Sequence, residues 1–422
     1  MLAFLQDRRR WLVVALLFVL QVVNYLDRQA LSVLAPDLRQ RLGFTAQQYS
    51  YIVSAFLTAY MLGFAFGGRL LDTWGVKRTL TAAVALWSVA GMLHATATHW
   101  VHLLGFRFLL GLGEAVGPAG GAKAISEWIP RSERAFCMSV FSNGLVTAAV
   151  LAPPIVAFLA VRFGWQTAFL VTGAIGFVWL AVWLRWYGPP ETHRSISDQE
   201  RALILSDRPP PAPRAAATGL LRNRTAWTFF AARLLTDPVP YFFTFWLPQY
   251  LQETRGFSVA LIGLIAWIPF LAADIGGLSG GAISDWLVRH GLTPTQARRR
   301  MMGAAACLTP AAFIALRAES NVVALASVAA VLAAHSCWTV NLQTSITETF
   351  PAHLTGAAIG MSGVGSSLGG IIATLLTGQV VGLYGYVPVF SVLAFVHALA
   401  FVVLTRARRG DARAVPDMSP AG

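Results

Sequence analysis

Charged residues are scarce in this chain. They make up 12% of its 422 residues, whereas hydrophobic residues make up 56% and the mean hydropathy is +0.60. Soluble domains carry about 25% charged residues, so the composition excludes an ordinary soluble protein and indicates an all-α integral membrane protein. Apolar stretches of about 20 residues can cross a bilayer as helices. Twelve such stretches are predicted to span the membrane, at residues 11–35, 48–71, 79–98, 101–125, 136–160, 165–187, 225–252, 258–284, 299–318, 320–346, 353–383 and 386–406.

Cysteine is also rare, and the three cysteines share no motif. Cys137, Cys307 and Cys337 each lie in an apolar stretch, and no CxxC spacing occurs. The sequence therefore indicates neither a disulfide framework nor a metal site. We expect all three cysteines to be packing residues.

Motifs of the common enzyme classes are missing as well. Gly111, Gly113 and Gly117 do not form GxGxxG and follow no predicted strand, and the sequence contains no Walker motif and no HExxH. The sequence also shows no nucleophile–base pair that would support an intramembrane enzyme. We therefore expect a protein that is not an enzyme and that needs no cofactor.

The net charge of +13 is distributed unevenly. If the N-terminus is cytoplasmic, the basic clusters at 8–10, 77–78 and 298–300, the central linker and the tail all fall on the cytoplasmic side. This asymmetry follows the positive-inside rule and predicts that both termini are cytoplasmic. A nucleic-acid-binding surface is the alternative explanation of a basic chain, and the placement of the charges beside membrane spans argues against it.

A polar segment divides the chain into two halves of six predicted helices each. The apolar signal stops between residues 188 and 224, where Ser197 could cap a short helix with Glu200 three residues later. The predicted organisation is an N-terminal half at 1–187, a cytoplasmic linker at 188–224, and a C-terminal half with a short tail at 225–422.

An internal repeat supports this division. Gly68-Arg69-Leu70-Leu71-Asp72 after the second predicted span is echoed by Gly281-Ala282-Ile283-Ser284-Asp285 after the eighth. Parallel repeats of six helices are typical of transporters that work by alternating access, with the substrate site at the midplane.

Two apolar stretches of the N-terminal half carry both acidic and basic residues. Asp27 and Arg28 are adjacent in the first stretch, and Arg107 and Glu114 lie seven residues apart in the fourth. Two turns of helix place Arg107 and Glu114 on one face. Ionisable groups at membrane depth are costly and mark a substrate or ion pathway by default. The sequence therefore predicts a membrane transporter with a charged central site.

The first copy of the repeat continues as Gly68-x-Leu70-x-Asp72-x-x-Gly75-x-Lys77-Arg78. This pattern resembles the loop between the second and third helices of the major facilitator superfamily. Glycines allow a tight turn and close helix approach, and Asp72 can pair with Arg131 or Arg134 or lie at a helix N-terminus. The candidate cytoplasmic gate comprises Gly68, Asp72, Gly75, Lys77, Arg78 and Arg134. The alternative is a solvated turn that obeys the positive-inside rule.

Other stretches resemble the anion:cation symporter family, in particular its hexuronate and sugar-acid members. They are Asn24-Tyr25-Leu26-Asp27-Arg28, the segment from Arg107 to Ala115, Glu127-Trp128-Ile129-Pro130, Leu235-Thr236-Asp237-Pro238, the segment from Phe245 to Leu251, the segment from Pro269 to Asp274, and Cys337-Trp338-Thr339-Val340-Asn341. Two segments depart from the family pattern, the one from Gly117 to Gly121 and Ser142-Asn143-Gly144. Because both segments lie where side chains could hydrogen-bond the substrate hydroxyls, they leave the identity of the sugar acid open.

The resemblance implies which residues bind the anion. Arg28 would grip a carboxylate, because a planar guanidinium makes bidentate pairs and does not deprotonate. Tyr25 and Tyr60 resemble family residues that hydrogen-bond the anion, although Tyr60 could instead be a packing aromatic. Asn143, Trp338 and Asn341 could supply hydroxyl readout and stacking, or could hold helices together.

Proton coupling requires groups whose charge can change. Asp27 and Glu114 meet this requirement, and Arg107 is expected to hold Glu114 in some states. Substrate binding to Arg28 would weaken the hold of cations on these carboxylates and favour their protonation. A static salt bridge is the alternative. His335 is expected to be a packed histidine rather than the proton site.

The sequence thus predicts a proton-coupled symporter that takes up an organic anion by alternating access, and the resemblance implies that this anion is a hexuronate such as galacturonate or glucuronate. Symport of another small carboxylate, an aldonate or a monocarboxylate, and passive facilitation are the alternatives. We expect a monomer in the bacterial cytoplasmic (inner) membrane. Its expected partners are the anion, protons and the lipid bilayer, with no nucleic acid and no metal.

Overall fold

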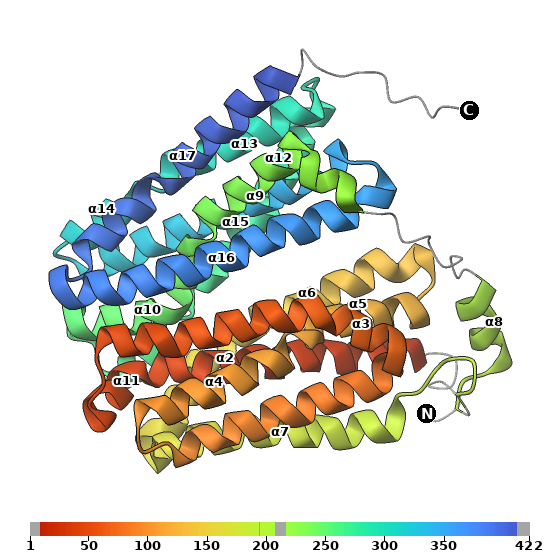
Figure 1. Ribbon diagram of the computed structural model, residues 1–422, viewed down its shortest axis with the longest axis horizontal. Helices are drawn as coiled ribbons and strands as arrows, with labels where there is room; N and C mark the ends of the chain where they lie inside the picture. Colours follow the sequence, from red (N-terminus) through yellow and green to blue (C-terminus); the bar gives the residue numbers. More distant parts are fainter. Residues whose placement is uncertain (1–8, 194, 207–216, 412–422) are drawn as a thin grey trace. The chain divides into compact units, whose positions relative to one another are not determined.

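The computed structural model describes residues 9–193, 195–206 and 217–411, and all regular structure within them is helical (Figure 1). The N-terminal elements are α2 (Arg9–Leu42), α3 (Ala46–Leu93), η1 (His94–Thr96), α4 (Trp100–Glu114), α5 (Val116–Trp128), α6 (Arg131–Phe163), α7 (Trp165–Trp186) and α8 (Asp198–Ser206). They are followed by η2 (Ala217–Arg222), α9 (Arg224–Thr236), α10 (Pro238–Arg255), α11 (Val259–Ile265), α12 (Ile268–Arg289), α13 (Pro294–Leu308), α14 (Ala311–Arg317), α15 (Asn321–Thr349), α16 (Ala352–Tyr384) and α17 (Val387–Asp411).

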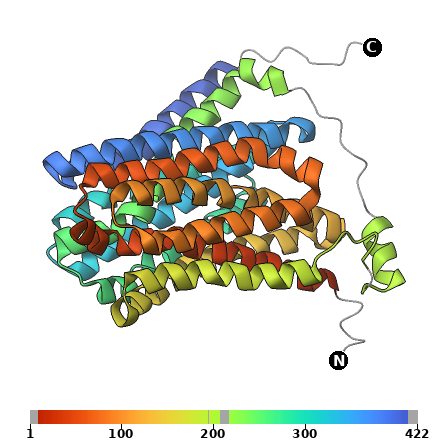
Figure 2. The same cartoon turned by 60° about the horizontal axis from the view of Figure 1, so that its bottom comes forward.

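Eight stretches of the described chain are long and apolar enough to cross a membrane. They are Arg9–Leu42, Phe66–Thr96, Phe136–Phe163, Trp165–Trp186, Val259–Arg289, Asn321–Thr349, Leu354–Tyr384 and Val387–Arg406. Several run as unbroken helices, and α7 and α16 are easily followed in both views (Figures 1 and 2). The all-helical membrane architecture is confirmed, whereas the predicted number of twelve spans is not established by this count.

The difference arises where predicted spans are fused or broken. The second and third predicted spans form one helix, α3, which kinks at Gly75 because this residue has φ 76° and ψ 166°. The predicted spans at 101–125, 225–252 and 299–318 are each divided into two shorter helices, α4 and α5, α9 and α10, and α13 and α14. None of these six shorter helices alone reaches the length of about 20 residues that a full membrane crossing needs.

Each of these breaks lies close to a proline. Proline has no N–H and cannot bond the carbonyl four residues earlier, so Pro118 frees the carbonyl of Glu114. The side-chain amide of Asn24 donates to that oxygen at 3.3 Å. In the same way Pro310 frees the carbonyl of Ala306, which accepts the Thr309 hydroxyl at 3.1 Å. Polar side chains thus replace the helical hydrogen bonds that proline removes, as a membrane environment requires.

The chain forms two compact units. Unit 1 comprises Met1–Pro213 and Thr244–Trp267, and unit 2 comprises Arg214–Phe243 and Ile268–Gly422. Residues 244–267 belong to unit 1 by their contacts, one of which is the Tyr49 hydroxyl donating to the carbonyl of Phe245 at 2.8 Å. The predicted boundaries at 187 and 225 divide the chain by sequence order, and they remain a prediction.

The predicted linker helix is present as α8. Ser197 caps it as predicted, because its Oγ accepts the backbone N–H of Glu200 at 3.1 Å. The Glu200 carboxylate accepts the backbone N–H groups of Arg9 and Arg10, at 3.2 and 3.1 Å, and so caps α2. The linker helix is therefore attached to the first helix of unit 1 through a buried carboxylate.

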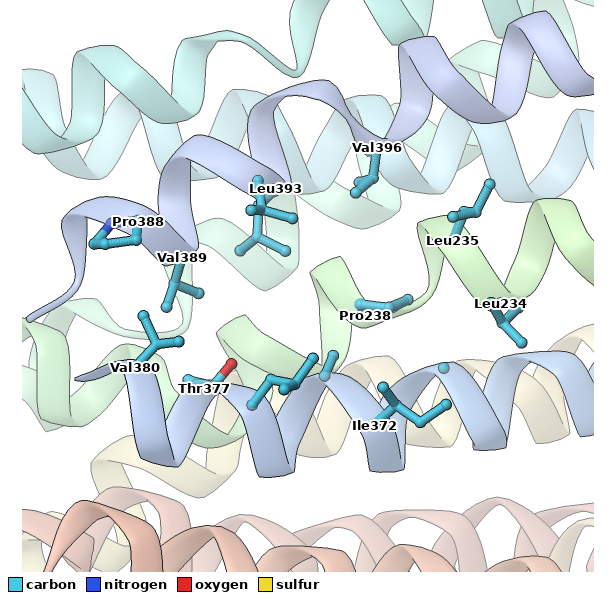
Figure 3. Close-up of a pocket in the computed structure, with 14 residues that line it drawn as sticks. Leu234, Leu235, Pro238, Ile372, Thr377, Val380, Pro388, Val389, Leu393 and Val396 are labelled. Carbon is cyan, nitrogen blue, oxygen red and sulfur yellow. The ribbon is translucent and has the colours of Figure 1, made fainter. Parts of the chain in front are cut away.

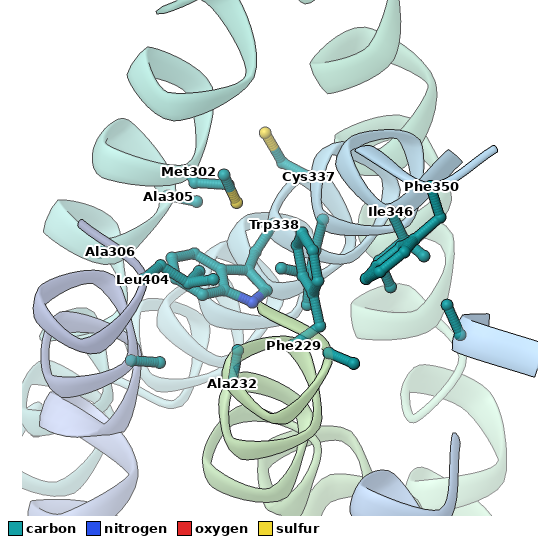
Figure 4. Packing of buried hydrophobic residues seen from close by; sticks show 14 of the residues in the cluster. Phe229, Ala232, Met302, Ala305, Ala306, Cys337, Trp338, Ile346, Phe350 and Leu404 are labelled. Carbon is teal, nitrogen blue, oxygen red and sulfur yellow. The ribbon is translucent and has the colours of Figure 1, made fainter. Parts of the chain in front are cut away.

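Unit 2 has a hydrophobic core around Trp338, which is fully buried on α15. Figure 4 shows its indole among Phe229, Ala306 and Leu404, which come from three other helices. Glycines of α12 allow this helix to approach α15 closely. An added Cβ at Gly276 would lie 2.5 Å from the Cα of Ala333. Small residues at such crossings are how membrane helices pack.

Gly276→Ala is expected to lower the melting temperature of the purified protein, because the backbone of α15 cannot yield to the new methyl group. Overpacking typically costs about 1–3 kcal/mol. Gly281→Ala is the matched control on the same helix, since its Cβ would lie 3.5 Å from Val340 Cγ1, an ordinary contact. Equal melting temperatures for the two variants, measured by differential scanning fluorimetry, would contradict the close α12–α15 approach.

Candidate functional site

Two of the four predicted charged site residues of unit 1, Arg28 and Glu114, form a buried ion pair between α2 and α4. The Arg28 guanidinium contacts Glu114 Oε2 through Nη2 at 2.9 Å and Nε at 3.0 Å. The Arg28 side chain is 12% exposed and the Glu114 side chain is fully buried. This is a charge-assisted pair in a low-dielectric environment, where such interactions are strongest.

The break between α4 and α5 positions Glu114. Its main-chain carbonyl accepts the amide of Asn24, and its carboxylate accepts Arg28, one turn further along α2. Asn24 Oδ1 in turn accepts a hydrogen bond from Arg28 at 3.4 Å. Asn24 was not predicted as a site residue. The available signal was Pro118, four residues after Glu114, which predicts a free carbonyl at that position.

Aromatic rings surround the Arg28 guanidinium. Its Cζ lies 4.7 Å from the ring centre of Tyr60, 5.1 Å from Phe56 and 5.4 Å from Tyr25. Cation–π contacts of this kind stabilise a desolvated guanidinium. The structure therefore brings the predicted Tyr25 and Tyr60 together with Arg28 and adds Phe56, which the sequence analysis missed. The predicted hydrogen bonds from the two tyrosines to an anion remain a prediction.

Arg107 is placed differently from the expectation. The residue is 2% exposed, and both Nη atoms donate to the backbone carbonyl of Arg28 at 3.2 Å. The predicted Arg107–Glu114 pairing is therefore not the arrangement in this structure, where Glu114 pairs with Arg28. Arg107 instead binds the main chain of α2 at the position that carries Arg28.

Asp27 lies on a different face of α2 from Arg28. It is 3% exposed, and neither carboxyl oxygen has a hydrogen-bond partner among the described residues. Its Oδ1 faces Gly91 of α3, where an added Cβ would be 3.6 Å away. Burying an ionised carboxylate without donors or a cation is very costly. The surroundings of Asp27 thus suit the protonated acid better than the anion.

Three other predicted substrate residues have separate surroundings. Asn143 has an exposed position on α6 in unit 1. Trp338 is in the core of unit 2, and Asn341 is 1% exposed there, donating to the carbonyls of Cys337 at 2.9 Å and Gly280 at 3.3 Å. Trp338 and Asn341 therefore make contacts that hold helices together, which is the alternative role given for them in the sequence analysis. Their predicted contacts with substrate remain predictions.

The candidate cytoplasmic gate includes a basic residue that was not proposed for it, and the predicted pairing of Asp72 with Arg131 remains a prediction. Asp72 pairs with Lys123 of α5 at 2.8 Å, and Lys123 also donates to the carbonyl of Leu71 at 2.9 Å. Arg134, one of the two predicted partners, donates to the carbonyls of Ser126 and Ile129. The side chain of Arg131 lies outside the described residues. Lys123 was overlooked because it lies within a predicted span.

The remaining gate residues lie in α3, with Gly75, Lys77 and Arg78 at its kink and Gly68 about two helical turns before it. No atom lies within 4 Å of a Cβ added at Gly68, and Gly75 adopts a positive φ that disfavours other residues. Lys77 donates to the carbonyl of Leu184 at 3.0 Å. Lys77 and Arg78 also line a polar cavity of about 500 Å³.

Tyr187 lies in the same polar cavity. Its hydroxyl contacts the Glu127 carboxylate at 3.3 Å. Burial, together with this carboxylate, raises the pKa of Tyr187 well above its usual value. The phenol therefore stays protonated and donates to Glu127.

An apolar cavity of about 350 Å³ in unit 2 does not have the chemistry of an anion site. Figure 3 shows it between α16 and α17 beside the break at Pro238, with Leu234, Ile372 and Leu393 among its lining residues. Thr377 supplies the one polar side chain of that lining. A carboxylate there would lose its hydration without gaining a cation. The ion-pair site around Arg28 is therefore the better candidate.

Comparisons with known proteins agree with this description. Residues 17–315 match the family model described as Major Facilitator Superfamily. The chain is 30% identical to the hexuronate transporter of Escherichia coli K12 over 401 residues, covering 94% of this chain and 93% of that protein. It is 35% identical over 277 residues to the galacturonate transporter of Dickeya chrysanthemi, covering 64% and 80%.

Solved structures share the fold at low sequence identity. The crystal structure of a D-xylose-proton symporter has a TM-score of 0.74 at 15% identity, covering 94% of this chain and 96% of that one. An inward-facing, occupied bacterial homolog of the human lysosomal transporter Spinster has a TM-score of 0.74 at 16% identity, covering 98% and 99%. Identities this low carry information on the fold alone.

Proposed function

This chain belongs to the Major Facilitator Superfamily, and we propose that it is a proton-coupled symporter that takes up a sugar acid, such as galacturonate or glucuronate, by alternating access. The protein is a multi-pass membrane protein of a transporter family and not an enzyme. The observation that carries the proposal is the buried Arg28–Glu114 pair, with Arg28 surrounded by aromatic rings.

The proposed mechanism begins with an exchange of carboxylates at Arg28. Glu114 now occupies the position that a substrate carboxylate would take on the guanidinium. A hexuronate carries one carboxylate that can replace Glu114, whose oxygen Oε2 now accepts both Nη2 and Nε of Arg28. Tyr25 and Tyr60 lie close enough to Arg28 to contact a ligand bound there. The relatives named as hexuronate and galacturonate transporters support this class of substrate.

Proton coupling follows from the same exchange. Once the substrate has displaced Glu114, that carboxylate is left buried without its cation. A buried, unpaired carboxylate binds a proton instead of remaining ionised. The anion and one proton then enter the site together. Asp27, which is already buried without a hydrogen-bond partner among the described residues, is the second candidate proton carrier.

We also retain the wider organisation as part of the proposal. Twelve spans result if each proline-broken pair of helices crosses the membrane once and α3 crosses it twice. Both termini would then be cytoplasmic, and the Gly68–Arg78 segment would close the cytoplasmic side. A bacterial inner-membrane location and a monomeric state complete the expectation.

Two alternative functions lead to different results. Another carboxylate, such as an aldonate, is favoured by the 27% identity over 423 residues to a D-galactonate transporter of Escherichia coli. A passive facilitator would bind the anion but would not accumulate it when a pH gradient is imposed. The buried carboxylates Asp27 and Glu114 argue against the second alternative.

A ligand panel tests the substrate class directly. Purified protein is heated with saturating galacturonate, glucuronate, galactonate or lactate, and the melting temperature is measured. A ligand at 100 times its Kd stabilises the folded state by about 2.7 kcal/mol. We expect the two hexuronates to raise the melting temperature more than the other acids, with neutral galactose as the control. A rise with lactate alone would contradict the sugar-acid assignment.

A further inference from the structure

The polar cavity of unit 1 has no part in the proposed transport mechanism. Its volume is about 500 Å³, within the range of small-molecule sites, about 300–1,000 Å³. Lys77 and Arg78 of α3 line this cavity together with Glu127 of α5 and Glu191, which follows α7. The cavity therefore carries two cations and two carboxylates, none of which belongs to the ion-pair site around Arg28.

The two cations keep hydrogen-bond donors for a ligand. Lys77 Nζ donates to the carbonyl of Leu184 at 3.0 Å, which uses one of the three N–H groups of the ammonium. Arg78 is exposed, and neither Lys77 nor Arg78 forms an ion pair with a carboxylate of the described residues. An ammonium and a guanidinium that are adjacent in sequence suit a phosphate group, which accepts charge-assisted hydrogen bonds from both.

The two carboxylates indicate that a ligand of this cavity also carries a positive charge. Glu127 accepts the hydroxyl of Tyr187 at 3.3 Å, and Glu191 is exposed. A ligand with negative charge alone would be repelled by both carboxylates, whereas an ammonium group would be attracted by them. The charges of the cavity thus match a zwitterion that contains one phosphate and one ammonium group.

A second, apolar cavity of about 240 Å³ lies along α3. Among its lining residues, Leu62, Phe66 and Leu86 are 38%, 64% and 37% exposed. Thr79 is the one polar side chain among the described lining residues, and its hydroxyl already donates to main-chain carbonyls within α3. This cavity therefore suits an alkyl chain and offers nothing to a charged group.

Trp74 joins the polar cavity to the apolar one. Its side chain is 56% exposed and lines both of them. Tryptophan is enriched where a membrane meets water, because its ring is apolar and its N–H is polar. Lys77 and Arg78 follow three and four residues later. A charged cavity and an apolar cavity that share one indole match a molecule with a charged head and an alkyl chain.

We propose that unit 1 binds one phospholipid with a zwitterionic headgroup, phosphatidylethanolamine, at the kink of α3. The phosphate binds Lys77 and Arg78, and the ammonium group lies against Glu127 and Glu191. One acyl chain passes Trp74 and fills the apolar cavity. The bound lipid holds together the two limbs of α3 that meet at the kink. This site is separate from the ion-pair site, and the inference does not depend on the proposed sugar-acid transport.

A lipid titration followed by native mass spectrometry tests the phosphate contacts. It counts the phosphatidylethanolamine molecules bound per protein and gives the Kd of the first. We expect Lys77→Gln combined with Arg78→Gln to raise this Kd about ten-fold or more, because charge-assisted hydrogen bonds are lost. An unchanged Kd would overturn the proposal.

The matched control replaces two adjacent arginines elsewhere. Arg299 and Arg300 of α13 are exposed and line neither cavity. Arg299→Gln combined with Arg300→Gln should leave the Kd as in the wild type. An equal rise of the Kd in both double variants would show that net charge alone attracts the lipid, and would overturn the proposed site. Melting temperatures measured without added lipid show that each variant is folded.

Three further ligands test the headgroup and the acyl chain. Phosphatidylglycerol has no ammonium group and should bind about two- to five-fold more weakly than phosphatidylethanolamine, as expected for the loss of a partly exposed ion pair. Glu191→Gln should reduce this difference. Inorganic phosphate and glycerophosphoethanolamine, which lack acyl chains, should not displace the lipid at equal concentration. Equal affinity for both phospholipids, or displacement by either soluble ligand, would overturn the assignment of a zwitterionic phospholipid.

Discussion

Arg28→Ala is expected to weaken sugar-acid binding severely. Arg28 is the cation of the buried site in unit 1, and it has Glu114, Asn24 and three aromatic rings around it. Without it, a substrate carboxylate would be desolvated and unpaired. Losing one partner of a buried charge pair costs about 2–5 kcal/mol, so the Kd should rise by roughly 30-fold to several thousand-fold. Calorimetry with galacturonate measures this change.

Arg28→Lys should also be impaired. An ammonium group is a point charge and cannot reproduce the two contacts that Nη2 and Nε of the guanidinium make with Oε2 of Glu114. It would also have to replace the hydrogen bond from Arg28 to Asn24. We expect a weaker but measurable affinity, intermediate between the wild type and Arg28→Ala.

Two controls distinguish recognition from folding. Arg41→Ala removes an arginine of the same helix whose side chain is 60% exposed and pairs with Asp37, so binding should be unchanged. Arg28→Ala combined with Glu114→Gln removes the uncompensated carboxylate that the single variant leaves behind. The double variant should have a higher melting temperature than Arg28→Ala. Its affinity for galacturonate should remain low. Near-normal binding by Arg28→Ala would show that the carboxylate is held elsewhere.

The members of the charged site were predictable from the sequence, but their pairing was not. A charged residue within an apolar stretch can be recognised from the sequence alone. This criterion identified Asp27, Arg28, Arg107 and Glu114. Which cation holds which anion depends on the packing of α2 against α4 and α5. The seven-residue spacing suggested Arg107 as the partner of Glu114, whereas in the structure Arg28 of another helix takes this position.

Helix breaks account for most of what the sequence analysis missed in the fold. Hydropathy located the apolar stretches but could not show that Pro118, Pro238 and Pro310 divide three of them. The consequences of these breaks are local and specific. One exposes the carbonyl that Asn24 binds, and another places Asp237 between two helices.

Contacts between residues far apart in the chain were the least predictable. The rings of His335 and His397 are joined by a hydrogen bond of 3.1 Å although the two residues are 62 positions apart, and each taken alone is a lone histidine in an apolar stretch. The same holds for the Asp72–Lys123 pair, in which Lys123 was assigned to a span rather than to the gate. Neither pair has a spacing or a motif that the sequence could reveal.

Glu114→Gln is expected to retain the exchange of substrate across the membrane but to lose the accumulation of substrate that a pH gradient drives. The amide mimics the protonated acid, and Arg28 no longer has an anionic partner competing with substrate. Labelled galacturonate should therefore still exchange in counterflow. A pH gradient of two units is worth about 2.7 kcal/mol per proton and can drive about 100-fold accumulation in the wild type. If Glu114 carries the only coupled proton, accumulation by the variant should fall to nearly one-fold.

Counterflow and pH-driven accumulation are both measured in proteoliposomes made from the same protein preparation. Glu319→Gln, at an exposed acidic residue of unit 2, is the control and should accumulate substrate as the wild type does. Equal loss of counterflow and accumulation in Glu114→Gln would indicate a structural role, because the Arg28 pairing would then be needed in every state. Intact accumulation would instead place the coupled proton on another group. Asp27 is then the next carboxyl group to replace. It is buried in the same apolar stretch as Arg28 and, unlike Glu114, has no hydrogen-bond partner in the described part of the chain.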